Sequence, residues 1–313
     1  MGRCKERLYG FLFPAETDSW LGLLRIGLGV QVVVYVVSLK DDWNYLFAGN
    51  GYGLIGRTFS EALLSTESPL IPRLSWLVML GSRVGLSEWT VLSIGWWALL
   101  CTSCALGVGL FCRSSATLTW FFHLCAAKSG GFISYGVDNF MTMGLFYLML
   151  SPLPDRYSFD QLWRKLPPKH RQLLGFWRRI LQLHLCLIYF FGGLTKALGG
   201  GWWNGSNLWR ALIRPPFNLI APEILVRWKS LFPFLGISVW VIEVGYIVFI
   251  WNRRTRPIWL ACVIGMHIAI GLAMGMYLFA LVMIVLNLAA FGPGWEFAKA
   301  RETFRFLDLR ARS

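Results

Sequence analysis

Long apolar runs separated by short polar segments dominate the chain. Helices of about 20 residues cross the roughly 30 Å hydrocarbon layer of a bilayer, and about eight runs approach that length. They cover approximately 20–39, 88–111, 116–133, 139–152, 180–199, 234–251, 257–273 and 276–291. The pattern predicts an all-α polytopic membrane protein, a bundle with some short or broken spans that forms a single domain over residues 1–313.

Two segments depart from the simple pattern. The apolar stretch 257–291 would measure about 50 Å as one helix, which exceeds the bilayer core. Gly271 and Gly275 offer a break, so two spans are predicted, with a single bent helix or a re-entrant pair as alternatives. Residues 74–86 are apolar but too short to cross, and we expect them at the membrane interface.

Charge sets the predicted orientation. Only 15% of residues are charged, yet the net charge is +14. Most lysines and arginines lie in alternate loops, above all 153–179 and 252–256, and such loops face the cytoplasm. We therefore expect a multi-pass protein of the cell (inner) membrane with both termini cytoplasmic. The expected partner of the apolar spans is the lipid bilayer. Nucleic acid is not expected as a partner, because the basic residues are explained by membrane orientation.

Cysteine and histidine give no metal or disulfide pattern. The seven cysteines are odd in number and lie mostly in apolar segments, which argues against a disulfide framework. Cys101 and Cys104 form a CxxC that we interpret as small packing residues. No paired histidine motif or carboxylate cluster occurs at ligand spacing, so no metal site is predicted.

Polar residues inside the spans are the candidates for chemistry, because a charge at the bilayer centre costs about 2.5–3.5 kcal/mol. Lys196 shares a helical face with Tyr189 and Gly192, and could serve as a base. Gly192 and Gly193 permit close approach of a helix or of a bound ring, so with Tyr189 they are candidate cofactor-binding residues. The alternative, which the spacing alone favours, is a lysine that reaches the headgroups.

The remaining candidates each have two interpretations. Glu243 could be protonated, or paired with Arg25 or Lys196. His267 could hold a ligand or simply be satisfied by a neighbour. Asp138 follows a glycine-rich break, where it could line a cavity or cap the next helix. Weaker candidates are His123, Lys128, Asn139 and His184.

Three stretches resemble a known family. They are LFPAETDSWLGLLRIGLGV with WNYLFAGNGYGLIG, then RILQLHLCLIYFFGGLTKALGGGWWNGSNL, then HIAIGLAMGMYLFALVMIVLNLAAF. They are similar to the HTTM (horizontally transferred transmembrane domain) family, related to the membrane domain of vitamin K-dependent γ-glutamyl carboxylase. The resemblance implies an intramembrane site in which Lys196 is the base that deprotonates a reduced, vitamin K-like quinone. Beyond that possible quinone, the cofactor is not specified.

The chain also departs from the carboxylase. Asp138 and Asn139 stand where the carboxylase has an asparagine followed by a histidine, and the tail after the last span is short. Carboxylation of a docked protein is therefore not expected. Three classes of function remain: an HTTM-type enzyme or peptide-maturation factor acting on a lipophilic or peptide substrate, a non-enzymatic membrane accessory or scaffold subunit that serves a partner protein, and a transporter. The absence of an internal repeat disfavours the transporter.

Overall fold

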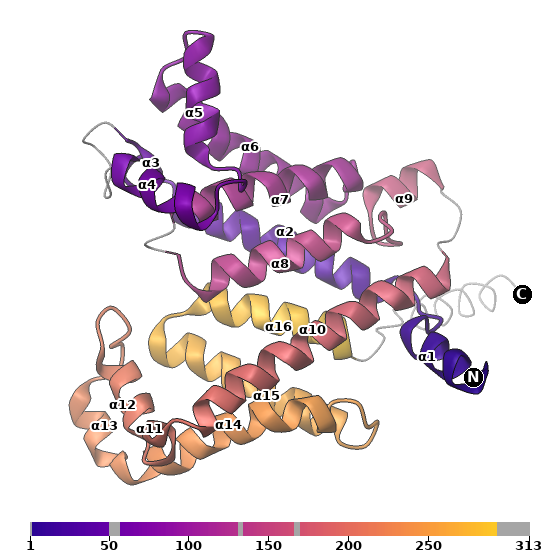
Figure 1. Ribbon diagram of the computed structural model, residues 1–313, viewed down its shortest axis with the longest axis vertical. Helices are drawn as coiled ribbons and strands as arrows, with labels where there is room; N and C mark the ends of the chain where they lie inside the picture. Colours follow the sequence, from indigo (N-terminus) through magenta and orange to yellow (C-terminus); the bar gives the residue numbers. More distant parts are fainter. Residues whose placement is uncertain (1, 50–56, 131–133, 166–169, 293–313) are drawn as a thin grey trace, which may run out of the picture.

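The structure is a computed structural model that describes residues 2–49, 57–130, 134–165 and 170–292. All regular elements in these ranges are helical, and no strand occurs among them. Figure 1 shows long helices lying side by side, with shorter helices at their ends. The all-helical prediction is confirmed for this part of the chain.

The long helices run alternately in opposite directions. They are α2 (Ser19–Ser38), α6 (Glu88–Val108), α7 (Cys112–Ser129), α8 (Gly136–Leu150), α10 (Arg171–Ala197), α14 (Phe232–Phe249), α15 (Arg256–Met274) and α16 (Tyr277–Phe291). Each coincides with a predicted span. Five segments are long and apolar enough to cross a membrane: α2, α6, α10, Lys229–Phe249 and α15. The other three spans stay predictions from the sequence.

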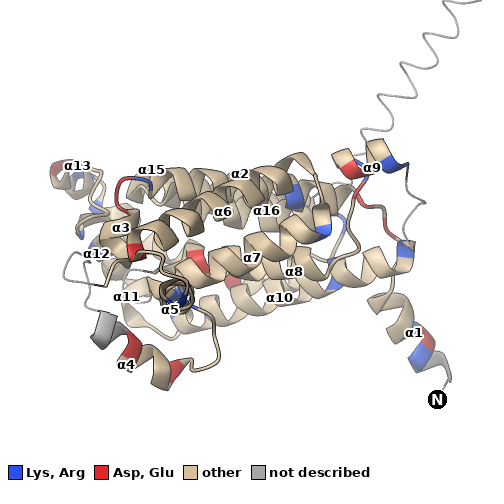
Figure 2. Ribbon diagram, turned by 90° about the horizontal axis from the view of Figure 1, so that it is seen from above, with Lys and Arg blue, Asp and Glu red and all other residues tan. Residues whose placement is uncertain are grey.

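The two ends of the bundle differ in what covers them. We call the end where α2 and α10 begin the basic end, and the end where α10 finishes the Lys196 end. Charged residues lie mostly towards these two ends, with few along the helices (Figure 2). The basic end carries α1 (Gly2–Leu12) and α9 (Phe159–Arg164).

Short helices occupy two segments between predicted spans at the Lys196 end. Residues 40–87 contain α3 (Trp43–Phe47), α4 (Arg57–Glu67) and α5 (Leu74–Arg83). Residues 200–230 contain α11 (Gly200–Trp203), α12 (Ser206–Ile213), α13 (Pro222–Arg227) and the 3-10 helix η1 (Lys229–Leu231). Leu212, Leu225 and Phe232 form a separate apolar cluster, which holds α12 and α13 against the start of α14.

The break in the apolar stretch 257–291 falls at Gly275. This glycine has a φ of 71°, a left-handed conformation that ends α15 and that side chains rarely adopt. The prediction of two helices is confirmed, but Gly271 is no part of the break. It lies within α15, where a Cβ atom would come 3.0 Å from the Cβ of Ala280, so it lets α15 and α16 pack closely.

Helix α10 begins at Arg171, well before the predicted span start at 180. Its 27 residues are about 40 Å long, which exceeds the bilayer core. The extra turns carry Arg178, which forms an ion pair with Glu16 at 2.8 Å. Arg178 also donates to the carbonyl oxygens of Ala290 (3.0 Å) and Gly292 (3.1 Å) at the end of α16. A helix leaves such carbonyls without partners, so this contact extends α10 and caps α16.

Candidate functional site

Lys196 and Glu243 form an ion pair at the Lys196 end. Lys196 lies in the last turn of α10 and Glu243 in the middle of α14, and their Nζ and Oε2 atoms are 2.6 Å apart. The side chains are 25% and 11% exposed, respectively. The sequence left the partner of Glu243 open, and the structure joins it to Lys196. Lys196 is therefore tied to a carboxylate of the next long helix, although part of its side chain stays accessible.

Two adjacent glycines have different roles beside this pair. A Cβ atom on Gly193 would lie 2.7 Å from the backbone nitrogen of Val244, so only glycine lets α10 and α14 approach this closely. A Cβ atom on Gly192 would meet only Glu243 Oε2 at 3.6 Å and Lys196 Nζ at 3.7 Å. Gly193 therefore brings the helices together, while Gly192 leaves one side of the ion pair uncovered.

Aromatic and backbone groups complete the surroundings of the amine. Lys196 Nζ lies 5.5 Å from the ring centroid of Trp202 in α11, close enough for a cation–π interaction. It also donates a long hydrogen bond of 3.4 Å to the carbonyl oxygen of Gly192. The amine thus has one strong partner, one weak partner and an aromatic face, which leaves donor capacity for a ligand.

A buried chain of polar side chains runs inward from this site. The hydroxyl of Tyr246 donates to Asn287 Oδ1 at 2.7 Å, and Asn287 Nδ2 donates to the hydroxyl of Tyr189 at 2.7 Å. The Tyr189 hydroxyl lies 2.8 Å from His267 Nε2. Because Tyr189 already accepts from Asn287, its own proton is available for His267. All four side chains are nearly or fully buried.

The chain ends at a nitrogen with no partner. His267 Nδ1 is buried and forms no hydrogen bond within the described part of the chain, although its ring contacts Phe279. Lys196 is close enough to interact electrostatically with His267, and Glu243 with Tyr189. The structure therefore groups Lys196, Glu243, Tyr189 and His267, all of them candidates from the sequence. Asn287 and Tyr246 complete the chain and were not predicted.

Asp138 lies in a different place and both of its interpretations hold. Its Oδ1 accepts from the Tyr35 hydroxyl at 3.1 Å, and its Oδ2 accepts from the backbone N–H of Tyr135 at 3.0 Å, which caps α8. It also lines a cavity of about 480 Å³ between α4, α7 and α8. None of these contacts joins Asp138 to the Lys196 group. Lys128 and Asn139 line the same cavity.

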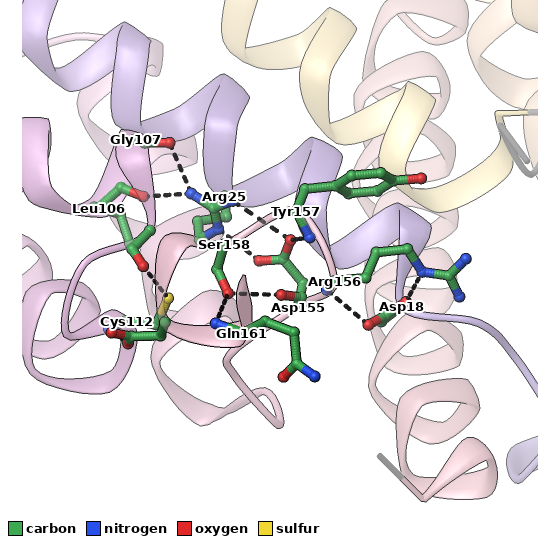
Figure 3. A network of polar contacts seen from close by, with 12 residues as sticks. Asp18, Arg25, Leu106, Gly107, Cys112, Asp155, Arg156, Tyr157, Ser158 and Gln161 are labelled. Carbon is green, nitrogen blue, oxygen red and sulfur yellow. Dashed lines mark hydrogen bonds and ion pairs between the residues drawn. The ribbon is translucent and has the colours of Figure 1, made fainter. Parts of the chain in front are cut away.

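Arg25, the other predicted candidate partner of Glu243, is bound at the basic end. Figure 3 shows it between α6 and the loop that follows α8. Its Nε lies 2.5 Å from Asp155 Oδ2, and its Nη1 donates to the carbonyl oxygens of Leu106 and Gly107, each at 2.7 Å. Arg25 and Asp155 are both completely buried. The sequence missed Asp155, because it lies in a segment read as a basic loop.

The two other histidine candidates each form one local hydrogen bond, although the Nε2 atom of His123 is buried without a partner among the described residues. His123 Nδ1 is 3.0 Å from Thr142 Oγ1, and His184 Nδ1 is 2.7 Å from the hydroxyl of Tyr147. No group of three or more histidine, cysteine or acidic side chains is placed to hold a metal ion in the ranges that the structure describes. Cys101 and Cys104 are free and exposed, so their prediction as packing residues is wrong.

Comparisons with protein-family models, curated proteins and solved structures give no match to this chain. The relationship to the HTTM family stays a prediction from the sequence. What the chain does must therefore be argued from its own residues.

Proposed function

We propose that the protein is a multi-pass membrane enzyme of the HTTM type, in which Lys196 is the base for a lipophilic weak acid. The observation that carries the proposal is the Lys196–Glu243 pair, 2.6 Å long and one quarter exposed at the lysine. An amine held beside an apolar region and still reachable from outside is what proton abstraction from a membrane-soluble substrate requires. The site would lie in the inner membrane, at the end opposite the cytoplasmic loops.

Glu243 gives Lys196 a route to its basic form. Transfer of one proton from Lys196 Nζ to Glu243 Oε2 turns the ion pair into an amine and a carboxylic acid, and no net charge is created in the apolar layer. The free amine then takes a proton from the substrate. Glu243 can afterwards return its own proton to a group at the surface, since its side chain is not fully buried.

The residues around the amine fit a flat aromatic cofactor. A reduced quinone, the class that the family resemblance implies, would supply an acidic hydroxyl on an apolar ring. Trp202 offers a ring face beside the amine, and Gly192 leaves the pair uncovered on one side. The unpartnered Nδ1 of His267 is a second group that could meet a polar atom of such a ring.

Binding measurements in lipid nanodiscs test the proposal. Reduced and oxidised menaquinone would be titrated into the wild type, Lys196→Ala and Lys196→Arg, with Lys229→Ala as a matched control at the same end of the bundle. We expect saturable, pH-dependent binding of the reduced form to the wild type and the control. Both Lys196 variants should lose the pH dependence, because neither alanine nor arginine can act as a base near neutral pH. Equal binding by all four proteins would contradict the proposal.

A non-enzymatic accessory or scaffold subunit is the second candidate. The favouring observation is that the same ion pair joins α10 to α14 and could serve only to hold them together. The double variant Lys196→Met/Glu243→Met separates the two functions, because an apolar pair of similar size can replace a buried ion pair without loss of stability. If the protein is a scaffold, the double variant should keep its function in the cell. If it is an enzyme, the double variant should lose catalysis, because the base is gone.

A further inference from the structure

A second site lies apart from Lys196, in the cavity between α4, α7 and α8. The cavity measures about 480 Å³, within the range of about 300–1,000 Å³ that holds small molecules. Its charged and amide lining residues come from the end of α4, the last turn of α7 and the first turn of α8, and we call this part of the cavity its mouth. Its walls carry both charged and apolar side chains.

The mouth of the cavity carries charges of both signs without partners. Lys128 comes from the last turn of α7, and Glu67 from the end of α4. Neither side chain forms a hydrogen bond or ion pair with any described residue. The Asn139 amide, in the first turn of α8, also lines the cavity without a side-chain hydrogen bond. These three groups are therefore free to bind one ligand.

The part of the cavity lining away from the mouth is apolar. Trp120 lies about two turns before Lys128 on α7, which places it roughly 12 Å further from the mouth. Its ring contacts Phe146 at a centroid distance of 5.7 Å, and Met143 completes this wall. Charged and amide groups at the mouth and aromatic groups away from it match a ligand with a charged head and an apolar tail.

We propose that this cavity binds the head group of a zwitterionic aminophospholipid of the phosphoethanolamine type. Lys128 and the Asn139 amide bind the phosphate, and Glu67 accepts hydrogen bonds from the primary ammonium. The apolar wall at Trp120 and Phe146 takes the upper part of an acyl chain.

The balance of charge favours a zwitterion over an anion. Among the described residues, two carboxylates (Glu67 and Asp138) and one lysine line the cavity. A head group that is only anionic therefore meets an excess of negative charge from these residues. Asp138 has both oxygens occupied, which leaves Glu67 as the acceptor for the ammonium. A quaternary ammonium has no N–H group to donate, so choline loses these hydrogen bonds.

Native mass spectrometry of the detergent-solubilised protein can compare three phospholipids with identical acyl chains and ethanolamine, choline or glycerol head groups. We expect the ethanolamine lipid to bind at least about tenfold more tightly than the other two, in line with one hydrogen bond to a charged group. Glu67→Gln should remove the preference for ethanolamine over glycerol. Lys128→Gln should lower the affinity for the ethanolamine lipid and for the glycerol lipid by a similar factor.

Matched controls and a second variant keep the outcome decisive. Glu223→Gln and Lys229→Gln change exposed residues at the same end but outside the cavity, and should leave the preference intact. Asn139→Trp, at an exposed position on the rim, should reduce binding of all three lipids. Equal affinity for the three lipids, a preference for ethanolamine over glycerol that survives Glu67→Gln, or lipid affinities that Lys128→Gln leaves unchanged would each overturn the proposal.

One further arm identifies the source of the head group. If millimolar phosphoethanolamine displaces the lipid from the cavity of the wild type, the head group alone is sufficient for binding and a soluble zwitterion can be the ligand. If the head-group preference persists without displacement by phosphoethanolamine, the acyl chain is also required and the ligand is a membrane lipid. A failure of quinone binding at Lys196 leaves this result unaffected, since the two sites share no residue.

Discussion

Two of the ion pairs in the described part of the chain have opposite surroundings. Arg25 and Asp155, at the basic end, are fully buried, and the arginine also donates to two backbone carbonyls. Lys196 and Glu243, at the other end, are partly exposed, and apart from one long hydrogen bond to a backbone carbonyl the amine has no further polar partner. A pair whose donors and acceptors are all used can only hold the structure. A pair with capacity left can also take part in chemistry.

The glycines near each pair support the same distinction. At the basic end, a Cβ atom on Gly109 would lie 2.6 Å from the Cα of Ser158 and 3.0 Å from Arg25 Cζ, so the loop closes directly over the arginine. At the Lys196 end, Gly192 leaves ordinary contact space beside both charged groups. One pair is sealed by backbone and the other is left open, and this difference rather than the charge identifies the candidate site.

The largest effect is expected at the sealed pair. Arg25→Met leaves the Asp155 carboxylate buried without its cation, which should lower the free energy of unfolding by about 3–5 kcal/mol. Denaturant unfolding in detergent micelles would measure the loss. Arg156→Met, in the more exposed pair with Asp18, should cost no more than about 1 kcal/mol. Similar losses for the two variants would mean that Arg25 is not the buried tie described here.

A smaller effect should separate the two neighbouring glycines. Gly193→Ala places a methyl group against the α14 backbone and should cost about 1–3 kcal/mol, because α10 and α14 must move apart. Gly192→Ala meets no such obstacle and should leave stability nearly unchanged while it covers the ion pair. Thermal unfolding monitored by tryptophan fluorescence would compare them, with ligand binding measured on the same samples. Equal destabilisation would refute the division between the packing glycine and the open glycine.

The open pair is expected to contribute less to stability than the sealed pair. Lys196→Met alone should lower the free energy of unfolding by about 1–2 kcal/mol, less than at Arg25, because water reaches part of the pair. Adding Glu243→Met should recover most of this loss. A double-mutant cycle would measure the coupling between the two residues. Coupling as large as that between Arg25 and Asp155 would show that both pairs are mainly structural.

Local patterns in the sequence predicted the long helices well. The length of the apolar runs located every one of them. The final apolar stretch is divided at a glycine, as predicted, and the glycine is Gly275 in a left-handed conformation. Most short helices at the Lys196 end lie between the predicted spans and were not predicted, because they are short and depend on docking against the bundle, as α12 and α13 do. The start of α10 was placed too late, because its basic first turns are stabilised by contacts with Glu16 and the end of α16.

The sequence predicted most residues of the candidate site but not the contacts between them. Lys196, Glu243, Tyr189 and His267 were visible because a polar group in an apolar span is conspicuous. Asn287 offered the same signal, a lone amide in the apolar run of α16, and was overlooked. Pairing could not be predicted: Arg25 and Lys196 were equal candidates for Glu243, and only the arrangement of helices decides between them. Asp155 was hidden because a carboxylate in a basic loop looks exposed.

The contact of Arg178 with the end of α16 has a consequence for the order of assembly. Arg178 bridges Glu16, before α2, and carbonyl groups near Gly292, so it joins segments that are synthesised far apart in time. These three partners cannot meet until synthesis has passed Gly292 and α16 has been inserted. Until then, Arg178 has Glu16 available but lacks its carbonyl acceptors at the end of α16. The insertion of α16 therefore closes this end of the bundle, and a chain stopped before α16 would present an unfinished surface to the membrane quality-control proteases.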